Sequence, residues 1–134
     1  MPLKRQIVLC VDDDPDDQMM VLDAILEIDS SIRVASALNG LEALSFLEGA
    51  KQRDELPCLV IMDINMPLMD GKQALTLIKK DNVLQSIPVV LFTTSSATLD
   101  KSFAQHHSVE FLTKPINQQS LFTMVKRMLS HCKC

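Results

Sequence analysis

Three short runs of consecutive apolar residues divide the chain. They are IVLCV at 7–11, LVIM at 59–62 and VVLF at 89–92. Strands that are buried on both faces have this continuous apolar pattern, which is typical of a parallel sheet covered by helices on both sides. Two weaker patterns, IRVASA at 32–37 and VEFLT at 109–113, fit two further strands. The pattern therefore predicts five strands.

Between these runs the apolar residues recur with the spacing of a helix. Residues 16–28 begin with two acids and continue into an apolar face, and residues 98–107 carry a weaker version of the same pattern. Two middle helices are marked by Leu41, Leu44 and Leu47, and by Ala74, Leu75, Leu77 and Ile78. The last helix has the clearest period, set by Leu121, Met124, Val125, Met128 and Leu129. The polar stretch at 48–57 is predicted to be a loop.

Five strands that alternate with five helices predict an α/β fold with an open, doubly wound parallel sheet. The chain has 134 residues and shows neither an internal repeat nor a linker-like segment. We therefore expect one domain over residues 1–134, with a core at about 7–130 and a frayed tail at 131–134.

Composition excludes several classes of protein. Hydrophobic residues make up 47% of the chain and charged residues 22%, which is ordinary for a globular protein. The net charge of -4 argues against a nucleic-acid partner, since such a surface is rich in Lys and Arg. No apolar run approaches the roughly 18–20 residues that a membrane span needs, and the MPLKRQ start does not resemble a signal peptide. A cytoplasmic protein without a membrane partner is expected.

The four cysteines are interpreted as free thiols. Cys10 and Cys58 lie in apolar stretches, where a free cysteine behaves as a small hydrophobic residue. Cys132 and Cys134 end the chain in SHCKC, which lacks a second ligand pair at zinc-site spacing. We expect this end of the chain to be reduced and frayed.

A polar residue follows each of four predicted strands. Asp12 and Asp13 follow the first, Asp63 the third, Thr93 ends the fourth and Lys114 follows the fifth. In open α/β sheets the ligand site lies outside the carboxyl ends of the strands, so these side chains are expected to meet in one crevice. Clustered carboxylates repel one another unless a positive charge lies among them. The pattern predicts a divalent cation site.

Four motifs in this order resemble response regulator receiver domains: VDDD at 11–14, MDINMPLMDG at 62–71, TTSSA at 93–97 and TKP at 113–115. The chain resembles in particular the stand-alone members, such as chemotaxis and phytochrome-associated regulators. The resemblance extends from residue 7 to about residue 130. It implies a flavodoxin-like sheet with the strand order 2-1-3-4-5 and five helices.

The resemblance also implies a magnesium-dependent phosphoryl site. Asp63 would be the phosphoacceptor and would share the Mg²⁺ ion with Asp13, which binds it directly. Asp12 would assist through water, and the backbone carbonyl of Asn65 would complete the protein ligands. Independent chemistry agrees, because Mg²⁺ prefers oxygen ligands and joins one or two carboxylates to a phosphate.

The remaining implied roles concern the fourth and fifth strands. Thr93 would meet the phosphoryl group with its hydroxyl, with Thr94 as the alternative, and Lys114 would pair with the phosphoacceptor and then with the phosphoryl oxygens. Phe111 stands where the family carries its switch aromatic, often Tyr, so the ring hydroxyl is missing. The resemblance implies a cis peptide before Pro115, whereas a trans bond is the commoner form before proline.

Three residues close to these motifs are interpreted without a chemical role. Asp16 and Asp17 are read as ordinary acids at a helix start, where the helix dipole favours negative charge. Gly71 is expected to allow a positive φ in the loop after the third strand.

The function expected from these features is a phosphorylation-controlled switch in a two-component, histidine kinase to aspartate phosphorelay. Its partners would be a histidine kinase or phosphotransfer protein and an unidentified downstream protein, and it would catalyse only its own phosphorylation and dephosphorylation. A haloacid-dehalogenase-type phosphatase is one alternative, although position 65 is Asn where that class has a second Asp. A docking module independent of phosphorylation is the other, although such modules usually lose one of the site residues retained here.

Overall fold

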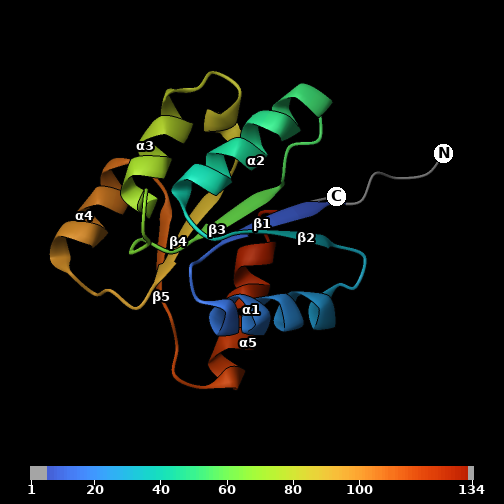
Figure 1. Cartoon of the computed structure of the whole chain (residues 1–134). Helices are drawn as coiled ribbons and strands as arrows, with labels where there is room; N and C mark the ends of the chain where they lie inside the picture. The colour runs from blue at the N-terminus through green and yellow to red at the C-terminus, as the bar shows by residue number, and fades with distance from the viewer. Residues whose placement is uncertain (1–5, 133–134) are drawn as a thin grey trace.

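Five parallel strands form the centre of the computed structural model, which describes residues 6–132 (Figure 1). The strands are β1 Ile7–Val11, β2 Arg33–Ala37, β3 Leu59–Met62, β4 Val89–Thr93 and β5 Glu110–Thr113. They pair in the order β2-β1-β3-β4-β5, with all four pairings parallel. The fold class and the strand order expected from the sequence are confirmed.

Helices cover both faces of this sheet. They are α1 Pro15–Ile28, α2 Gly40–Arg53, α3 Gly71–Lys80, the short 3-10 helix η1 Leu84–Ser86, α4 Thr98–His106 and α5 Gln118–Leu129. In Figure 1, α1 and α5 lie together on one face, and α2, α3 and α4 lie on the other. None of the helices within residues 6–132 combines the length and apolar character of a bilayer span.

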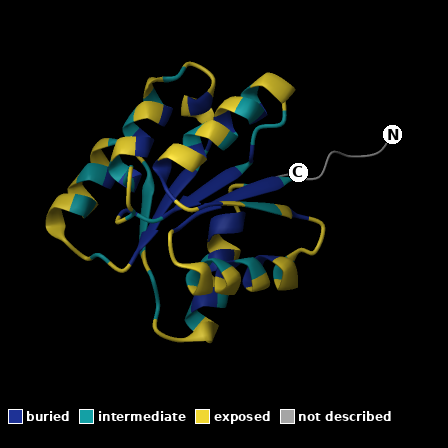
Figure 2. Ribbon diagram, in the orientation of Figure 1, coloured by how far each residue is buried: buried dark blue, intermediate teal, exposed yellow. Residues whose placement is uncertain are grey.

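The three continuous apolar runs form the buried middle strands. Every residue of β1, β3 and β4 is buried, as the dark strands of Figure 2 show. Successive side chains of a strand point to opposite faces, so Leu9 and Val11 pack with α2, α3 and α4, whereas Val8 and Cys10 pack with α1 and α5. Two apolar layers explain why these strands do not alternate with polar residues.

Helix α2 is longer than the sequence pattern predicted. The stretch at 48–57 was expected to be a loop, but the helix continues to Arg53 and ends at Asp54, whose φ is 55°. Ala50 is fully buried and keeps the inner face apolar. The polar residues around it occupy the outer face, where a helix tolerates them, so a polar run was mistaken for a loop.

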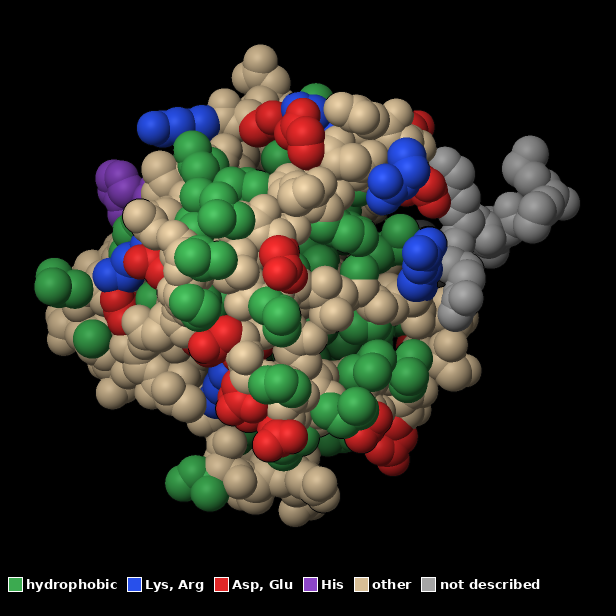
Figure 3. Space-filling view, viewed as in Figure 1, with side chains coloured by type: hydrophobic (Ala, Val, Ile, Leu, Met, Phe, Trp, Pro, Cys, Tyr) green, Lys and Arg blue, Asp and Glu red, His purple; other side chains and the backbone are tan. Residues whose placement is uncertain are grey.

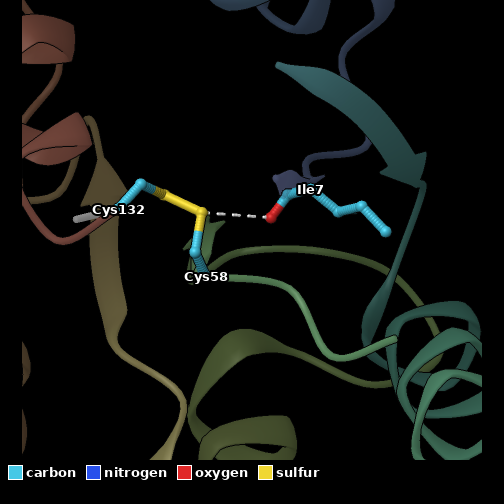
Figure 4. The surroundings of a disulfide bond; sticks show 3 residues. All are labelled: Ile7, Cys58 and Cys132. Carbon is cyan, nitrogen blue, oxygen red and sulfur yellow. Dashed lines mark hydrogen bonds between the residues drawn. A yellow bond between two sulfur atoms is a disulfide. The ribbon is translucent and has the colours of Figure 1, made fainter. Parts of the chain in front are cut away.

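The frayed tail expected at 131–134 does not include Cys132. Cys132 forms a disulfide with Cys58, which precedes β3, and the two Cα atoms lie 5.0 Å apart (Figure 4). The sulfur of Cys58 lies 3.4 Å from the carbonyl oxygen of Ile7 at the start of β1. The interpretation of Cys58 and Cys132 as free thiols was therefore wrong, while Cys10 is free and buried. Cys134 lies outside the described residues.

Candidate functional site

The candidate site lies where the strand order reverses. After β1 the chain crosses to β2 on one side of the sheet, and after β3 it crosses to β4 on the other side. In open α/β sheets, ligands bind at the carboxyl ends of the two strands between which the order reverses in this way. Asp12 and Asp13 follow β1, and Asp63 follows β3. One oxygen from each of the three carboxylates lies within 4.8 Å of the others. The structure thus brings together the three acids that the sequence predicted to meet.

Backbone hydrogen bonds fix two of these carboxylates. Asp12 Oδ1 accepts a hydrogen bond from the Asp14 amide at 2.9 Å, and Asp63 Oδ1 accepts one from the Ile64 amide at 2.7 Å. Gln18 of α1 holds the end of β1 itself, because its side-chain amide donates to the Asp12 carbonyl at 2.7 Å and to a β2 carbonyl at 2.8 Å. The second oxygen of each carboxylate therefore points to a defined place.

That place is occupied by the ammonium group of Lys114. Its backbone amide donates to the Thr93 carbonyl at 2.7 Å, which holds the end of β5 beside the end of β4. Its Nζ lies 2.6 Å from Asp12 Oδ2, 2.8 Å from Asp17 Oδ2 and 3.1 Å from Asp63 Oδ2. The Lys114 side chain is only 10% exposed, and those of Asp12 and Asp63 are 11% exposed, so these two ion pairs are largely shielded from water.

Burial and pairing act in opposite directions on the pKa values of this pair. Burial raises the pKa of Asp12, and the hydrogen bonds from Lys114 and the Asp14 amide offset this only in part. Burial alone would lower the pKa of Lys114, but hydrogen bonds to Asp12 and Asp17 and the charge of Asp63 outweigh it and raise that pKa. Lys114 is therefore charged across the physiological range.

Sequence reasoning missed Asp17, which was interpreted as an ordinary helix-start acid. It does lie in the first turn of α1, but its carboxylate contacts Lys114, the residue that follows β5. An acid that starts a helix is common, and nothing in the local pattern distinguishes Asp17 from its neighbour Asp16. The useful clue was topological, since α1 begins at the same end of the sheet at which β5 ends.

The hydroxyl and the aromatic ring expected near the site come from β4 and β5. Thr93 is fully buried at the end of β4, whereas Thr94 is exposed. Thr93 Oγ1 accepts a hydrogen bond from the Ser95 amide at 3.3 Å. Phe111 is half-buried and packs against the apolar layer between the sheet and α2, α3 and α4.

Gly71 serves the site in a way that differs from the expectation. Its φ is not positive, and the residue in this loop with a positive φ is Leu68, at 67°. A Cβ atom on Gly71 would lie 2.2 Å from the Asp63 carbonyl oxygen. The glycine is required because the start of α3 packs directly against the Asp63 backbone, where the Gly71 amide donates to the Ile64 carbonyl at 2.8 Å.

Two further expectations concern backbone groups. Asn65, whose carbonyl is a candidate metal ligand, lies in the exposed loop between β3 and α3. The peptide before Pro115 is trans, because no cis peptide occurs within residues 6–132. The cis bond implied by the family resemblance is therefore wrong for this structure.

The donor set fits a hard divalent cation. Asp12, Asp13 and Asp63 offer only oxygen ligands, which are those that Mg²⁺ and Mn²⁺ accept. Acidic side chains gather over the start of α1 in the space-filling view (Figure 3). Lys114 contacts three carboxylates, one of them Asp17, and a single ammonium group cannot neutralise these together with Asp13. A carboxylate beside a bound cation and an ammonium group is suited to accept a phosphoryl group.

Comparisons with known proteins agree with this geometry. Residues 8–126 match the family described as response regulator receiver domain. Protein PilH of Pseudomonas aeruginosa is 34% identical over 124 residues, which cover 92% of this chain and 97% of PilH. Response regulator Rcp1 of Synechocystis sp. is 32% identical over 125 residues, which cover 90% of this chain and 84% of Rcp1.

Solved structures extend the comparison to three dimensions. The phosphorylated cyanobacterial phytochrome response regulator RcpA superimposes with a TM-score of 0.86 at 28% identity, covering 95% of this chain and 93% of RcpA. The Mn²⁺-bound form of Rcp1 superimposes with a TM-score of 0.82 at 31% identity, covering 93% and 92% of the two chains. Other relatives are longer, and the chain spans 51% of one and 15% of another.

Proposed function

The chain belongs to the response regulator receiver domain family, and on that premise we propose that it is a phosphorylation-controlled switch whose phosphoacceptor is Asp63. Receiver domains act in two-component signalling and are not conventional enzymes, which disfavours a phosphatase. The observation that carries the proposal is the position of Asp63, within 4.8 Å of two further carboxylates and 3.1 Å from the Lys114 ammonium.

The phosphoryl step needs one nucleophile and one donor. An oxygen of the Asp63 carboxylate attacks the phosphorus of a phosphohistidine on the donor protein. The new oxygen–phosphorus bond forms, the phosphorus–nitrogen bond breaks, and the imidazole nitrogen leaves with the electron pair and takes up a proton. Reset requires water, whose oxygen attacks phosphorus, so that inorganic phosphate and a proton are released and the Asp63 carboxylate is restored.

Lys114, Thr93 and Phe111 have separate roles around the phosphoryl group. Lys114 donates hydrogen bonds to the phosphoryl oxygens as a compact charge, and its present contact with Asp63 supports that role. The Thr93 hydroxyl meets another phosphoryl oxygen, for which its burial at the strand end is suited. We assign the adjacent half-buried Phe111 as the switch aromatic, which enters the space that Thr93 vacates.

Mg²⁺ is proposed as the cation, held by Asp13 and Asp63, by Asp12 through water, and by the backbone carbonyl of Asn65. The three carboxylates within 4.8 Å support a divalent ion, and the Mn²⁺-bound Rcp1 structure supports a metal of this type in a similar protein. When bound, Mg²⁺ supplies charge neutralisation and a template for the phosphoryl oxygens.

A histidine kinase or a phosphotransfer protein is the proposed donor, and a separate downstream protein the proposed target. We also propose that residues 1–134 contain one receiver domain, with its core at about 7–130. A cytoplasmic location belongs to the same proposal. Disulfides are rare in that compartment, so the Cys58–Cys132 bond would there be exposed to reduction by cellular thiols.

Labelling with a small phosphodonor tests the phosphoacceptor. Incubation with radiolabelled acetyl phosphate and Mg²⁺ should give a modification that is stable in acid but removed by base or hydroxylamine, as an acyl phosphate is. Asp63→Asn keeps the shape of the side chain and removes the nucleophile, so labelling should disappear. Asp23→Asn, at an exposed position of α1, is the matched control and should label normally. Normal labelling of Asp63→Asn would exclude Asp63 as the phosphoacceptor.

A further inference from the structure

Three carboxylates contact the Lys114 ammonium group, and one of them, Asp17, has no role in the proposed phosphoryl chemistry. An ammonium group has three N–H donors, and here each donor has its own acceptor in Asp12, Asp17 and Asp63, at distances of 2.6, 2.8 and 3.1 Å. Asp17 comes from α1, whereas the other two follow β1 and β3. The contact therefore joins a helix to the end of β5, 97 residues away along the chain.

Asp17 differs from the other two acceptors in its surroundings. It is absent from the group of carboxylates that approach one another closely enough to share a cation, which contains Asp12, Asp13 and Asp63. Its side chain is 35% exposed, against 11% for Asp12 and Asp63. Its neighbour in sequence with the same charge is Asp16, which is exposed and forms no ion pair with Lys114.

The start of α1 is built to hold Asp17 in place. Asp14 is the N-cap, and its carboxylate accepts hydrogen bonds from the amides of Asp16 at 2.9 Å and Asp17 at 3.4 Å. Pro15 occupies the first position of the helix, where its fixed φ suits a helical start. These contacts hold the backbone of Asp17 at the start of the helix, and none of them involves a cation.

The three acceptors respond differently to the proposed chemistry. Asp12 and Asp63 give part of their negative charge to the cation, and phosphorylation converts the Asp63 carboxylate into an acyl phosphate. Both changes weaken their hold on the ammonium group. Asp17 neither takes part in the cation group nor reacts, so it is the acceptor of Lys114 that keeps its charge throughout.

We propose that Asp17 is a positioning residue that anchors Lys114 while Asp12 and Asp63 are engaged by the cation and the phosphoryl group. The inference rests on the proposed function, since it assumes that Lys114 serves the phosphoryl oxygens. One N–H of the ammonium stays on Asp17, and the other two are directed to the reacting group. Asp17 itself touches neither the cation nor the phosphoryl group.

A simpler role for Asp17 would be to stabilise the helix start through the helix dipole. Any acid in the first turn of α1 has this effect, and Asp16 has it too. Asp16→Asn therefore removes the same charge from the same turn, including its repulsion of an anionic phosphodonor, without touching Lys114. It is the matched control for Asp17→Asn.

The decisive experiment is a double-mutant cycle on the rate of phosphorylation by acetyl phosphate at saturating Mg²⁺. Asp17→Asn and Asp17→Ser should each lower the rate about 3- to 10-fold, which lies at the lower end of the coupling measured for residues in contact, while Asp16→Asn stays near wild type. In a Lys114→Met background, which is itself slow, adding Asp17→Asn should change nothing, because the anchored group is gone. Circular dichroism verifies that each variant is folded.

A second measurement needs neither metal nor phosphodonor. Lysine ammonium groups give separate NMR signals only when hydrogen bonds slow their exchange with water. The Lys114 signal should be visible in the metal-free wild-type protein and in Asp16→Asn, and broadened or lost in Asp17→Asn. This readout reports the position of Lys114 and would not respond to a change in helix stability alone.

Two results would overturn the inference. One is a rate for Asp17→Asn equal to that of Asp16→Asn, and the other is an equal slowing by Asp17→Asn in the wild-type and Lys114→Met backgrounds. Failure of the proposed function would look different, because Asp63→Asn would still be labelled or Lys114→Met would react at the wild-type rate.

Discussion

Thr93 Oγ1 accepts a hydrogen bond from the Ser95 amide at 3.3 Å, and this contact is the first step from the acidic site to α4. The Ser95 hydroxyl donates to Asp100 Oδ2 at 2.5 Å, and Asp100 also forms an ion pair with Lys72 in the first turn of α3. The hydrogen bonds from Lys72 and then Ser95 lower the pKa of Asp100. A rotation of the Thr93 hydroxyl toward a phosphoryl group would release the Ser95 amide and so reach α4.

We predict that Thr93→Ala separates phosphorylation from its effect on the surface. The variant keeps Asp63 and should still accept a phosphoryl group, but it lacks the hydroxyl that contacts the Ser95 amide. NMR shifts or amide exchange at 99–113 should respond to phosphorylation in the wild type and much less in the variant. Thr94→Ala, at the exposed neighbouring position, is the control and should respond fully. Equal responses of Thr93→Ala and wild type would refute this route.

A second prediction concerns the cation. Asp13 is the exposed member of the three-carboxylate group. Within residues 6–132 its side chain has no hydrogen bond or ion pair, so its proposed role is to bind the cation. Asp13→Ala should weaken Mg²⁺ and Mn²⁺ binding by at least about tenfold, measured by calorimetric titration. Without metal its free energy of unfolding should be unchanged or higher, because repulsion among the acids is relieved. Asp16→Ala should bind both ions like the wild type, and unchanged affinity in Asp13→Ala would remove Asp13 from the site.

The disulfide gives a prediction that depends on redox conditions. Cys58 and Cys132 are separated by 74 residues, so their bond restricts a long stretch of the unfolded chain. Urea unfolding of the oxidised wild type should give a free energy about 2–4 kcal/mol above that of Cys132→Ser. The difference in the free energy of unfolding should vanish when a reductant is present, because the wild type then loses its disulfide and the variant has none to lose. A wild-type stability that does not change on reduction would show that the bond does not form in solution.

Asp81, which lies far from the acidic site, should make the stability of the protein depend on pH. Amide hydrogen bonds from Leu84 and Val83 and the ion pair with Lys51 lower the pKa of Asp81 from 3.8 to about 2. A lowered pKa means that the folded state favours the ionised form, so the stabilisation is present above pH 3.8 and is lost as the pH falls from 3.8 to about 2. Asp81→Asn should thus be less stable than the wild type at pH 6.

The difference between Asp81→Asn and wild type should shrink when urea unfolding is repeated near pH 2. Asp23→Asn, which replaces an exposed acid of α1, is the control and should show no comparable pH-dependent difference. An Asp81→Asn difference that stays constant from pH 6 to pH 2 would mean that ionisation of Asp81 does not contribute to stability.

The sequence predicted the sheet and most of the acidic site because both follow from local patterns. Residues 7–11, 59–62 and 89–92 are apolar throughout, and such a run is enough to predict a strand that is buried on both faces. Since parallel strands end at one edge of their sheet, Asp12 and Asp63 had to lie near each other once the strand order was known. The resemblance to receiver domains supplied that order, and the structure confirms it.

Tertiary structure decided what no local pattern contains. The pairing of Asp17 with Lys114, the bond between Cys58 and Cys132, and the contact of Gly71 with the Asp63 backbone each join residues from different elements. A helix-start acid, an apolar cysteine or a loop glycine looks the same in the sequence whether or not such a partner exists. The sequence determines which residues are available at the ends of the strands and helices, and the packing of those elements determines which of them meet.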